Sequence, residues 1–526
     1  MRTVDAATLK AWLREGRELA ILDAREEGEF GHSHLFWAVP CPLSKRELRA
    51  RALLPRLSVR VVCVDGGEGY AEALARYLQG IGCADVQVLA GGTPAWIAAG
   101  FEAFSGVHVP SKAFGEWVEH HLGTESLDPA ELDALIRSGQ AHVILDSRPM
   151  DEFIKMSIPG GINVPGGELA YRIADLVPDA GTTIVVNCAG RTRSIMGAES
   201  LRQAGVPNRV VALRNGTMGW ELAGFGTMGW ELAGFACARG ATASHAPGTP
   251  RSAALALERA RAFAARHGVG EVTRAEAAAM AADTARSTYR LDVRAAEEYA
   301  AGHIPGFRHA PGGQLVQATD QWIAVRGARV LLACDDTVRA RMTGAWLRQL
   351  GGFEVFVVTD FANGPLAQGP WRPEVPELRA VPSITPAELA AMAGVTVFDL
   401  ARSIDFRAAH IPGSRWAIRG RLPRVDGPVV ITAPDETLAR LTAAETPGAR
   451  VLAGGLAAWR AAGLPVASDR HHPPDEACVD WYLRPYDRNS GVEAAMHAYL
   501  SWEVDLVHAV ARDGDAPFGA WPSPRG

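Results

Sequence analysis

The sequence of 526 residues is poor in the features that mark membrane, secreted and nucleic-acid-binding proteins. It has no apolar run long enough to cross a bilayer, and its charged, amphipathic beginning, MRTVDAATLKAWLREGRELAILDARE, is unlike a signal peptide. The net charge of -6 argues against a surface that binds nucleic acid. These absences predict a cytoplasmic, globular protein with neither a membrane nor a nucleic acid as its partner.

Cysteine is scarce, and its distribution excludes two common roles. The cysteines are odd in number, scattered along the chain and never arranged as C-x-x-C. This pattern fits a reducing compartment and argues against both a disulfide framework and a zinc site. The seven cysteines are Cys41, Cys63, Cys83, Cys188, Cys237, Cys334 and Cys478.

The chain contains one sequence unit four times, in agreement with a length that predicts roughly three to four domains. Each copy has an apolar run that ends in D-x-R or a close variant, and then a second apolar run that ends in a polar loop. The second runs read VVCVDGGEGYA, VVNCAGRTRS, LLACDDTVRA and VVITAPDETLA. From the aspartate to the first loop residue there are 42 positions in three copies and 34 in the fourth, which indicates an internal repeat. The pairs are Asp23 and Asp65, Asp146 and Cys188, Asp292 and Cys334, and Asp399 and Ala433.

Each unit alternates short β-branched runs with amphipathic helical stretches. The run TIVVN ahead of Cys188 has the pattern of a buried parallel strand, and residues 194–204 have the pattern of a helix. Such alternation predicts a doubly wound α/β sheet, in which ligands bind beyond the carboxyl ends of the strands. Cys188 stands at such a place.

The D-x-R, H-I-P-G-like, C-x-x-G-x-R-S and Gly-Trp motifs together resemble the rhodanese family of sulfurtransferases. The resemblance covers nearly the whole chain and implies four tandem rhodanese-like domains, each a mostly parallel sheet flanked by helices. The second unit matches best, whereas the third lacks the Gly-Trp segment that closes the others. The expected domains are residues 1–106, 122–240, 268–372 and 380–469, followed by a C-terminal helical extension over residues 470–526.

The loop CAGRTRS is suited to hold an anion against a sulfur. The nucleophile of sulfur transfer is a thiolate, so the surroundings of Cys188 must favour negative charge. Arg191 and Arg193 supply positive charge, Gly190 lets successive N–H groups converge, and a helix that begins near Ser194 directs its positive end at the same point. Ser194 is expected to cap that helix. The residues expected to bind the donor are Ala189, Gly190, Arg191, Thr192, Arg193 and Ser194.

The resemblance also implies a reaction. Cys188 would attack the outer sulfur of thiosulfate, sulfite would leave, and the resulting persulfide would pass its sulfur to cyanide or a thiol. No metal or organic cofactor is implied. Arg193 matches the arginine of the family's C-x-x-G-x-R motif and is the better candidate for the donor's ligand, whereas Arg148 is expected to form a structural salt bridge.

The other three loops lack parts of this chemistry. Asp65 and Ala433 stand where the second unit has Cys188, so neither loop can form a persulfide, and Cys63 falls inside the preceding strand. The third loop keeps Cys334, but Asp335 and Asp336 beside it should raise the thiol pKa and repel an anion. We expect the third unit to be inactive toward thiosulfate, although Cys334 could still relay sulfur.

Two other functions fit the same loop. Cysteine phosphatases and arsenate reductases of a related fold also use a cysteine and an arginine around an anion, but they need C-x5-R, and the spacing here is C-x4-R. A non-enzymatic persulfide sensor or binding scaffold is the third hypothesis. Among donors, thiosulfate, glutathione persulfide and a protein persulfide all fit, and 3-mercaptopyruvate is disfavoured because its subgroup has a C-G-S-G-V-T loop.

The segment GTMGWELAGF occurs twice without a change, at residues 216–225 and 226–235. Since one copy suffices for a unit, the second is interpreted as an insertion at the domain edge, where added length is tolerated. Either Trp220 or Trp230 can fill the native position. The insertion is expected to leave the Cys188 loop intact.

Overall fold

The computed structural model of the protein describes residues 1–224 and 238–519. Within these residues the chain forms four parallel sheets, each flanked by helices, which confirms the predicted α/β class. The sheets belong to two compact units, which are described separately. One unit consists of residues 1–9, 20–107 and 373–495, and the other of residues 10–19, 108–372 and 496 onwards.

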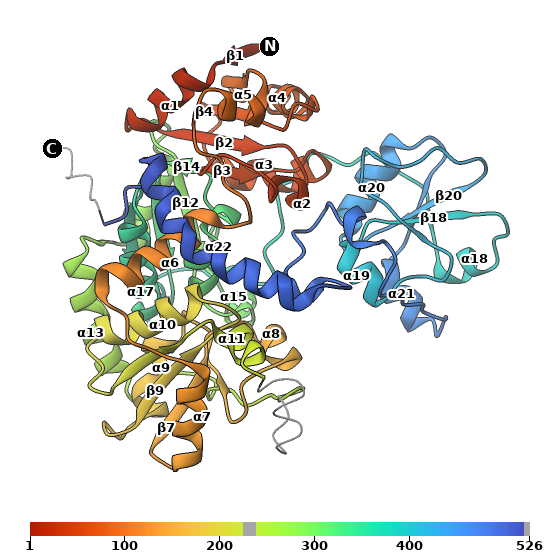
Figure 1. Ribbon diagram of the computed structural model, residues 1–526. Helices are drawn as coiled ribbons and strands as arrows, with labels where there is room; N and C mark the ends of the chain where they lie inside the picture. Colours follow the sequence, from red (N-terminus) through yellow and green to blue (C-terminus); the bar gives the residue numbers. More distant parts are fainter. Residues whose placement is uncertain (225–237, 520–526) are drawn as a thin grey trace. The chain divides into compact units, whose positions relative to one another are not determined.

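The second sheet, which carries the Cys188 loop, has the strand order β6-β10-β9-β7-β8, with every pair parallel. Its central strand is β9, the TIVVN run, and helices cover the sheet (Figure 1). The strands are β6 (Ser126–Leu127), β7 (His142–Asp146), β8 (Ile162–Asn163), β9 (Thr183–Asn187) and β10 (Val210–Leu213). The helices are α7 (Pro129–Ser138), α8 (Met150–Lys155), α9 (Leu169–Leu176), α10 (Thr192–Gln203) and α11 (Gly216–Leu222).

The third sheet belongs to the same unit and repeats this topology, with the order β11-β16-β15-β12-β13. Its strands are β11 (Gly270–Val272), β12 (Thr288–Asp292), β13 (Arg308–His309), β15 (Arg329–Ala333) and β16 (Glu354–Val358). Its helices are α13 (Ala253–Arg266), α14 (Arg274–Ala282), α15 (Ala296–Ala301), α16 (Gly312–Gln317) and α17 (Val338–Leu350). Two more helices contribute to this unit: α6 (Val109–Leu122) and, from Met496 on, α22 (Val492–Asp513).

The other unit holds the first and fourth sheets, which have the same topology again. In the first sheet the order β1-β5-β4-β2 is followed by β3, which pairs with β2 off the main path, and the order of the fourth sheet is β17-β21-β20-β18-β19. The strands are β1 (Arg2–Val4), β2 (Leu19–Asp23), β3 (Ala38–Pro40), β4 (Arg60–Val64), β5 (Asp85–Leu89), β17 (Ser383–Ile384), β18 (Thr396–Asp399), β19 (Arg415–Trp416), β20 (Val429–Thr432) and β21 (Arg450–Leu452). The helices are α1 (Ala6–Arg14), α2 (Glu27–Phe30), α3 (Arg46–Leu53), α4 (Tyr70–Gly80), α5 (Gly92–Ala98), α18 (Pro386–Ala390), α19 (Ser403–Ala408), α20 (Glu436–Glu445) and α21 (Gly455–Ala461).

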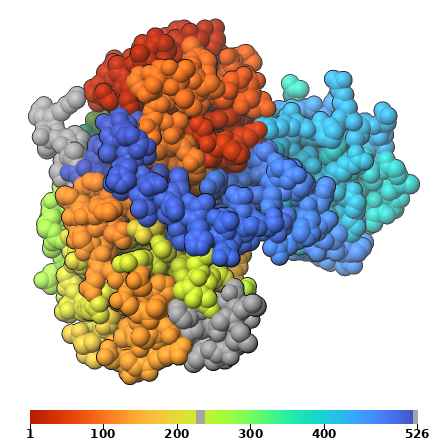
Figure 2. Space-filling view, viewed as in Figure 1, coloured from red at the N-terminus to blue at the C-terminus, as the bar shows by residue number. Residues whose placement is uncertain are grey.

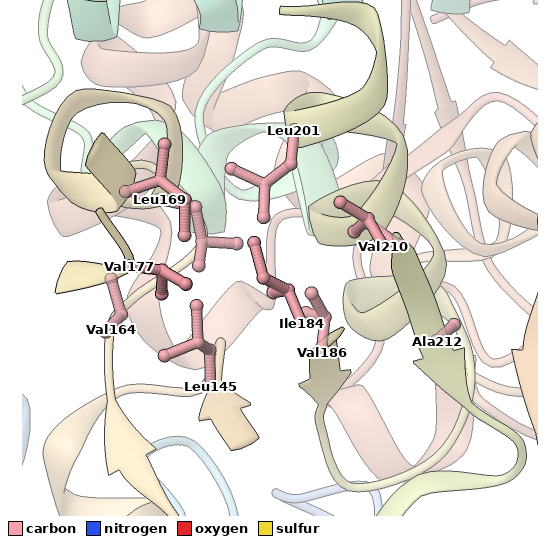
Figure 3. Packing of buried hydrophobic residues seen from close by; sticks show 11 residues of the cluster. Leu145, Val164, Leu169, Val177, Ile184, Val186, Leu201, Val210 and Ala212 are labelled. Atoms are coloured by element: carbon pink, nitrogen blue, oxygen red, sulfur yellow. The ribbon is translucent and has the colours of Figure 1, made fainter. Parts of the chain in front are cut away.

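An apolar core beneath α10 fixes the two ends of the Cys188 loop. Ile184 and Val186 of β9 pack with Leu169 of α9 and Leu201 of α10, and each of these side chains is fully buried (Figure 3). Burial of a leucine, isoleucine or valine side chain stabilises a fold by roughly 1.5–3 kcal/mol. The core therefore holds the end of β9 and the start of α10 in place, and the loop spans the short gap between them.

The first copy of the duplicated segment supplies the packed tryptophan. Trp220 of α11 is fully buried in a cluster with Ile144 and Val211. Its counterpart Trp230 lies outside the described residues. The start of α11 also contacts the loop, because the N–H groups of Thr217 and Met218 donate to the carbonyl oxygens of Cys188 and Ala189.

Candidate active site

Cys188 lies immediately after β9, at the carboxyl edge of the sheet, and is only 2% exposed. The N–H of Thr217 donates to its carbonyl oxygen at 2.8 Å, and Met218 donates to that of Ala189 at 2.9 Å. A Cβ on Gly216 would lie 2.4 Å from the Cys188 oxygen, so only glycine permits this approach. The loop carbonyls are thus held toward α11.

The backbone N–H groups of the loop have no acceptor in the part of the chain that the structure describes. Within residues 1–224 and 238–519, no side chain accepts a hydrogen bond from the backbone N–H groups of residues 189–193. Residues 189–191 form the loop, and residues 192–194 form the first turn of α10. A run of N–H groups at such a position is suited to bind an anion.

Ser194 does not cap the helix, which corrects the expectation from the sequence. The helix begins two residues earlier, at Thr192, and its N-cap residue is Arg191, which makes no side-chain cap. The Ser194 hydroxyl donates back to the Arg191 carbonyl at 2.7 Å, as serine commonly does inside a first turn. Its oxygen also lies 3.6 Å from the Cys188 sulfur, so the hydroxyl is a direct neighbour of this thiol.

The two loop arginines have different partners. Arg193 makes a two-point salt bridge with Glu152 of α8, at 2.9 and 2.8 Å. Burial opposes its charge, but Glu152 and Cys188 raise the pKa of its guanidinium above the ordinary value. Arg191 instead pairs with Glu116 of α6, at 2.8 Å for both contacts, and with Glu119. The guanidinium of Arg191 is therefore paired with α6, and that of Arg193 with α8.

Arg148 forms the structural salt bridge that the sequence predicted. Its guanidinium donates twice to Asp146, at 2.9 and 2.7 Å, and once to the carbonyl of Met156 at 2.7 Å. The Asn187 amide donates to the same carboxylate at 2.8 Å. This buried cluster joins the ends of β7 and β9 next to Cys188.

The fourth repeat lacks this arginine, because its motif reads D-L-A-R. Asp399 is 2% exposed, and burial raises its pKa from 3.8 to about 6. Since the pKa is higher in the folded state, the folded domain is most stable below the unfolded pKa and loses stability as the pH rises through about 6.

We therefore expect Asp399→Asn to stabilise the fourth domain by about 3 kcal/mol above pH 7, because each pKa unit corresponds to about 1.4 kcal/mol. The gain should disappear near pH 4, where the wild-type carboxyl is protonated. Calorimetric unfolding of both proteins between pH 4 and pH 8 measures it. An equal gain at every pH would show that packing, and not the charge, is responsible.

In the other three loops, carboxylate side chains of the loop itself accept hydrogen bonds from backbone N–H groups. Asp65 accepts from the N–H groups of Gly67 and Ala71, at 2.9 and 3.0 Å. Asp336 accepts from Val338 and Arg339 at 2.7 and 3.0 Å, and Asp435 accepts from Thr437 at 2.8 Å. In each of these loops a carboxylate therefore accepts from at least one backbone N–H group at or near the start of the following helix.

Two further cysteines are buried near such loops. Cys63 lies inside β4, as predicted, and burial raises its pKa well above the ordinary value. Cys334 is also fully buried, and burial followed by the charge of Asp336 raises the pKa of its thiol. Its sulfur accepts a hydrogen bond from the N–H of Ala340 at 3.2 Å. Both environments disfavour a thiolate.

Within residues 1–224 and 238–519, no group of three or more His, Cys, Asp or Glu side chains is placed to hold a metal ion. In that part of the chain, no helix combines the length and apolarity needed to cross a bilayer.

Sequence reasoning missed several residues around the loop. Glu152, Glu116 and Glu503 were not expected to contact it, and α6 was not assigned to any domain. Polar residues at helical spacing in α6, such as Lys112 and Glu116, were a usable signal for a buried polar face. No local pattern pointed to Glu503.

The comparisons with known proteins identify the class. The model of the rhodanese-like domain matches residues 5–99, 128–223 and 273–362, so the chain belongs to the rhodanese-like family. The fourth repeat lies outside the matched residues, but its sheet has the same strand order.

Two relatives show how far the similarity extends. The crystal structure of a thiosulfate sulfurtransferase from Pseudomonas aeruginosa is 40% identical, covers 99% of this chain and 100% of its own, and superposes with a TM-score of 0.89. The HTH-type transcriptional regulator Rv0324 of Mycobacterium tuberculosis is 36% identical over 101 residues, which are 19% of this chain and 43% of the regulator. The chain thus spans less than half of that curated relative.

Proposed function

We propose that the protein is a sulfurtransferase that moves a sulfane sulfur from thiosulfate, or a related anionic donor, to cyanide or a thiol through a persulfide on Cys188. The observation that carries the proposal is the contrast between the four loops. In the other three loops a carboxylate accepts from one or two backbone N–H groups, whereas within the described part of the chain those of residues 189–193 have no acceptor and are available to a ligand. Membership of the family and the similarity to the Pseudomonas aeruginosa enzyme agree with it.

The reaction proceeds in two displacements. The Cys188 thiolate attacks the outer sulfur of thiosulfate, a new S–S bond forms, and the old S–S bond breaks with its electron pair leaving on sulfite. The persulfide anion on Cys188 is then attacked at its outer sulfur by the acceptor, and the Cys188 thiolate is restored. Cyanide becomes thiocyanate and a thiolate becomes a persulfide, so no external oxidant or reductant is needed.

The loop residues have distinct tasks in these steps. The N–H groups of Ala189 to Arg193 stabilise the persulfide anion and the charge that develops during its transfer. Arg193, held by Glu152, supplies positive charge beside the sulfur, and the Ser194 hydroxyl contacts the sulfur directly. Arg191 contributes its N–H, while its side chain holds the loop against α6.

We further propose that the protein works in the reducing cytoplasm. Six cysteines of the described residues are unpaired thiols, as expected where disulfides do not persist. In that compartment its substrates are a small anionic sulfur donor and a thiol that accepts the sulfur.

Initial-rate kinetics test the two-step reaction. With thiosulfate varied at several fixed cyanide concentrations, the double-reciprocal plots should be parallel, because sulfite leaves before cyanide reacts. Intersecting lines would contradict a persulfide intermediate. Formation of the persulfide without discharge to any acceptor would favour the sensor hypothesis.

A further inference from the structure

The C-terminal helix α22 contacts the Cys188 loop through Glu503. This side chain is 1% exposed, although it lies in the segment that follows the fourth repeat. One carboxylate oxygen, Oε1, accepts from the Thr192 hydroxyl at 3.4 Å across 311 residues of sequence. The same oxygen accepts from Lys112 of α6 at 2.9 Å. In Figure 1 the dark blue helix lies against the orange α6, and in Figure 2 the dark blue residues reach the surface of this view.

The approach of α22 to the loop is close at Gly190. A Cβ at this position would lie 3.0 Å from Oε2 of Glu503 and 3.2 Å from Cε1 of Tyr499. Both distances are shorter than ordinary van der Waals contact, so the glycine allows the helix to rest directly on the loop. Residues on both sides of Arg191 are thus in contact with α22.

The contact is part of a buried polar cluster rather than a lone charge. The Tyr499 hydroxyl donates to Oε1 of Glu503 at 3.0 Å, and Lys112 donates to the same hydroxyl. The Lys112 ammonium also lies over the rings of Tyr499 and Trp502, at 4.7 and 5.5 Å from their centres. The side chains of Glu503, Lys112 and Tyr499 therefore hold one another in position, independently of their contacts with the loop.

Glu503 could act on the reaction through its charge or through the position of the loop, and the geometry favours the second. A carboxylate beside the loop would repel an anionic donor, but Lys112 at 2.9 Å neutralises most of its charge at longer range. The hydrogen bond to Thr192 and the contact with Gly190 remain. Glu503 therefore acts on the reaction more through the position of the loop than through repulsion of an anionic donor.

We propose that Glu503 is a positioning residue for sulfur transfer. It ties residues 190–192 to α6 and keeps the loop N–H groups converged on the Cys188 sulfur, so the C-terminal helix is a working part of the active site. The inference rests on the proposed function, since it assigns Glu503 to the site at which the persulfide forms.

The test compares Glu503→Ala, Glu503→Gln and the matched control Asp505→Ala, an exposed residue of the same helix. Single-turnover persulfide formation is measured at saturating thiosulfate, together with the half-saturating concentration and the melting temperature. Glu503→Ala should slow the step on the order of 10-fold to 100-fold, because a small displacement of reacting groups is costly. Glu503→Gln should stay within about threefold of wild type, because its amide oxygen still accepts from Thr192 and Lys112.

Hydrogen exchange of the loop peptide provides a second readout that needs no activity. Glu503→Ala should accelerate exchange of the amides that donate to the loop carbonyls, those of Ser194, Thr217 and Met218, several-fold and leave β9 unchanged. Three outcomes would each overturn the inference. The first is unchanged loop exchange in Glu503→Ala, and the second is a rate of persulfide formation equal to that of Asp505→Ala. The third is an equal loss of rate and of melting temperature in the alanine and glutamine variants. If wild type forms no persulfide, the proposed function fails instead, and loop exchange still decides whether Glu503 positions the loop.

Discussion

Replacement of Cys188 by serine is expected to reduce sulfur transfer from thiosulfate to cyanide on the order of 1,000-fold or more. A serine hydroxyl is not ionised at neutral pH and cannot carry a persulfide, so the first half-reaction loses its sulfur nucleophile and the second loses its sulfur donor. The substitution changes one atom in a position that is 2% exposed, and the melting temperature should change little. The rate of thiocyanate formation measures the effect.

Cys334→Ser is the matched control. Cys334 occupies the same position in the third repeat, but it is fully buried and its loop N–H groups are taken by Asp336. The variant should therefore keep the wild-type rate. Loss of activity in Cys334→Ser with retention in Cys188→Ser would place the reaction in the third domain and contradict the account.

Arg148→Met is expected to destabilise the second domain by about 3–5 kcal/mol, because it leaves the Asp146 carboxylate buried without its counter-ion. Both side chains are almost fully enclosed, at 4% and 1% exposure, so water cannot replace the lost guanidinium. The methionine fills a similar volume, which limits any contribution from a cavity. Denaturant unfolding monitored in the second domain measures the loss.

The double variant Asp146→Asn/Arg148→Met separates charge from shape. An amide at position 146 removes the uncompensated charge, and the Asn187 side chain lies close enough to bond with it. Most of the lost stability should return. A double variant no more stable than Arg148→Met, or a single variant as stable as wild type, would show that the salt bridge does not hold β7 and β9 together.

The fold and the position of Cys188 at the end of a central strand could be predicted from the sequence, because both depend on local patterns. The aspartate and the arginine of D-x-R are two positions apart, and the Asp146–Arg148 salt bridge follows from that spacing. The apolar run before Cys188 fixed the end of a central strand, where a doubly wound sheet binds its ligands. Repetition of the same spacing in three units made the pattern specific.

The partners of the loop could not be predicted, because they come from distant parts of the chain. Glu116 meets Arg191 across 75 residues, and Glu503 meets Thr192 across 311. Arg191 and Arg193 are equivalent in charge, and only the fold shows that the first pairs with α6 and the second with α8. The start of α10 was missed because Arg191, which precedes it, is not a capping residue.

Intact-protein mass spectrometry after incubation with thiosulfate tests the central claim most directly. Wild type and Cys334→Ser should each gain the mass of one sulfur atom, Cys188→Ser should gain none, and cyanide should remove the added mass from the first two. A sulfur atom that remains on Cys188→Ser, or wild-type protein that gains none, would contradict a persulfide on Cys188 as the carrier of the reaction.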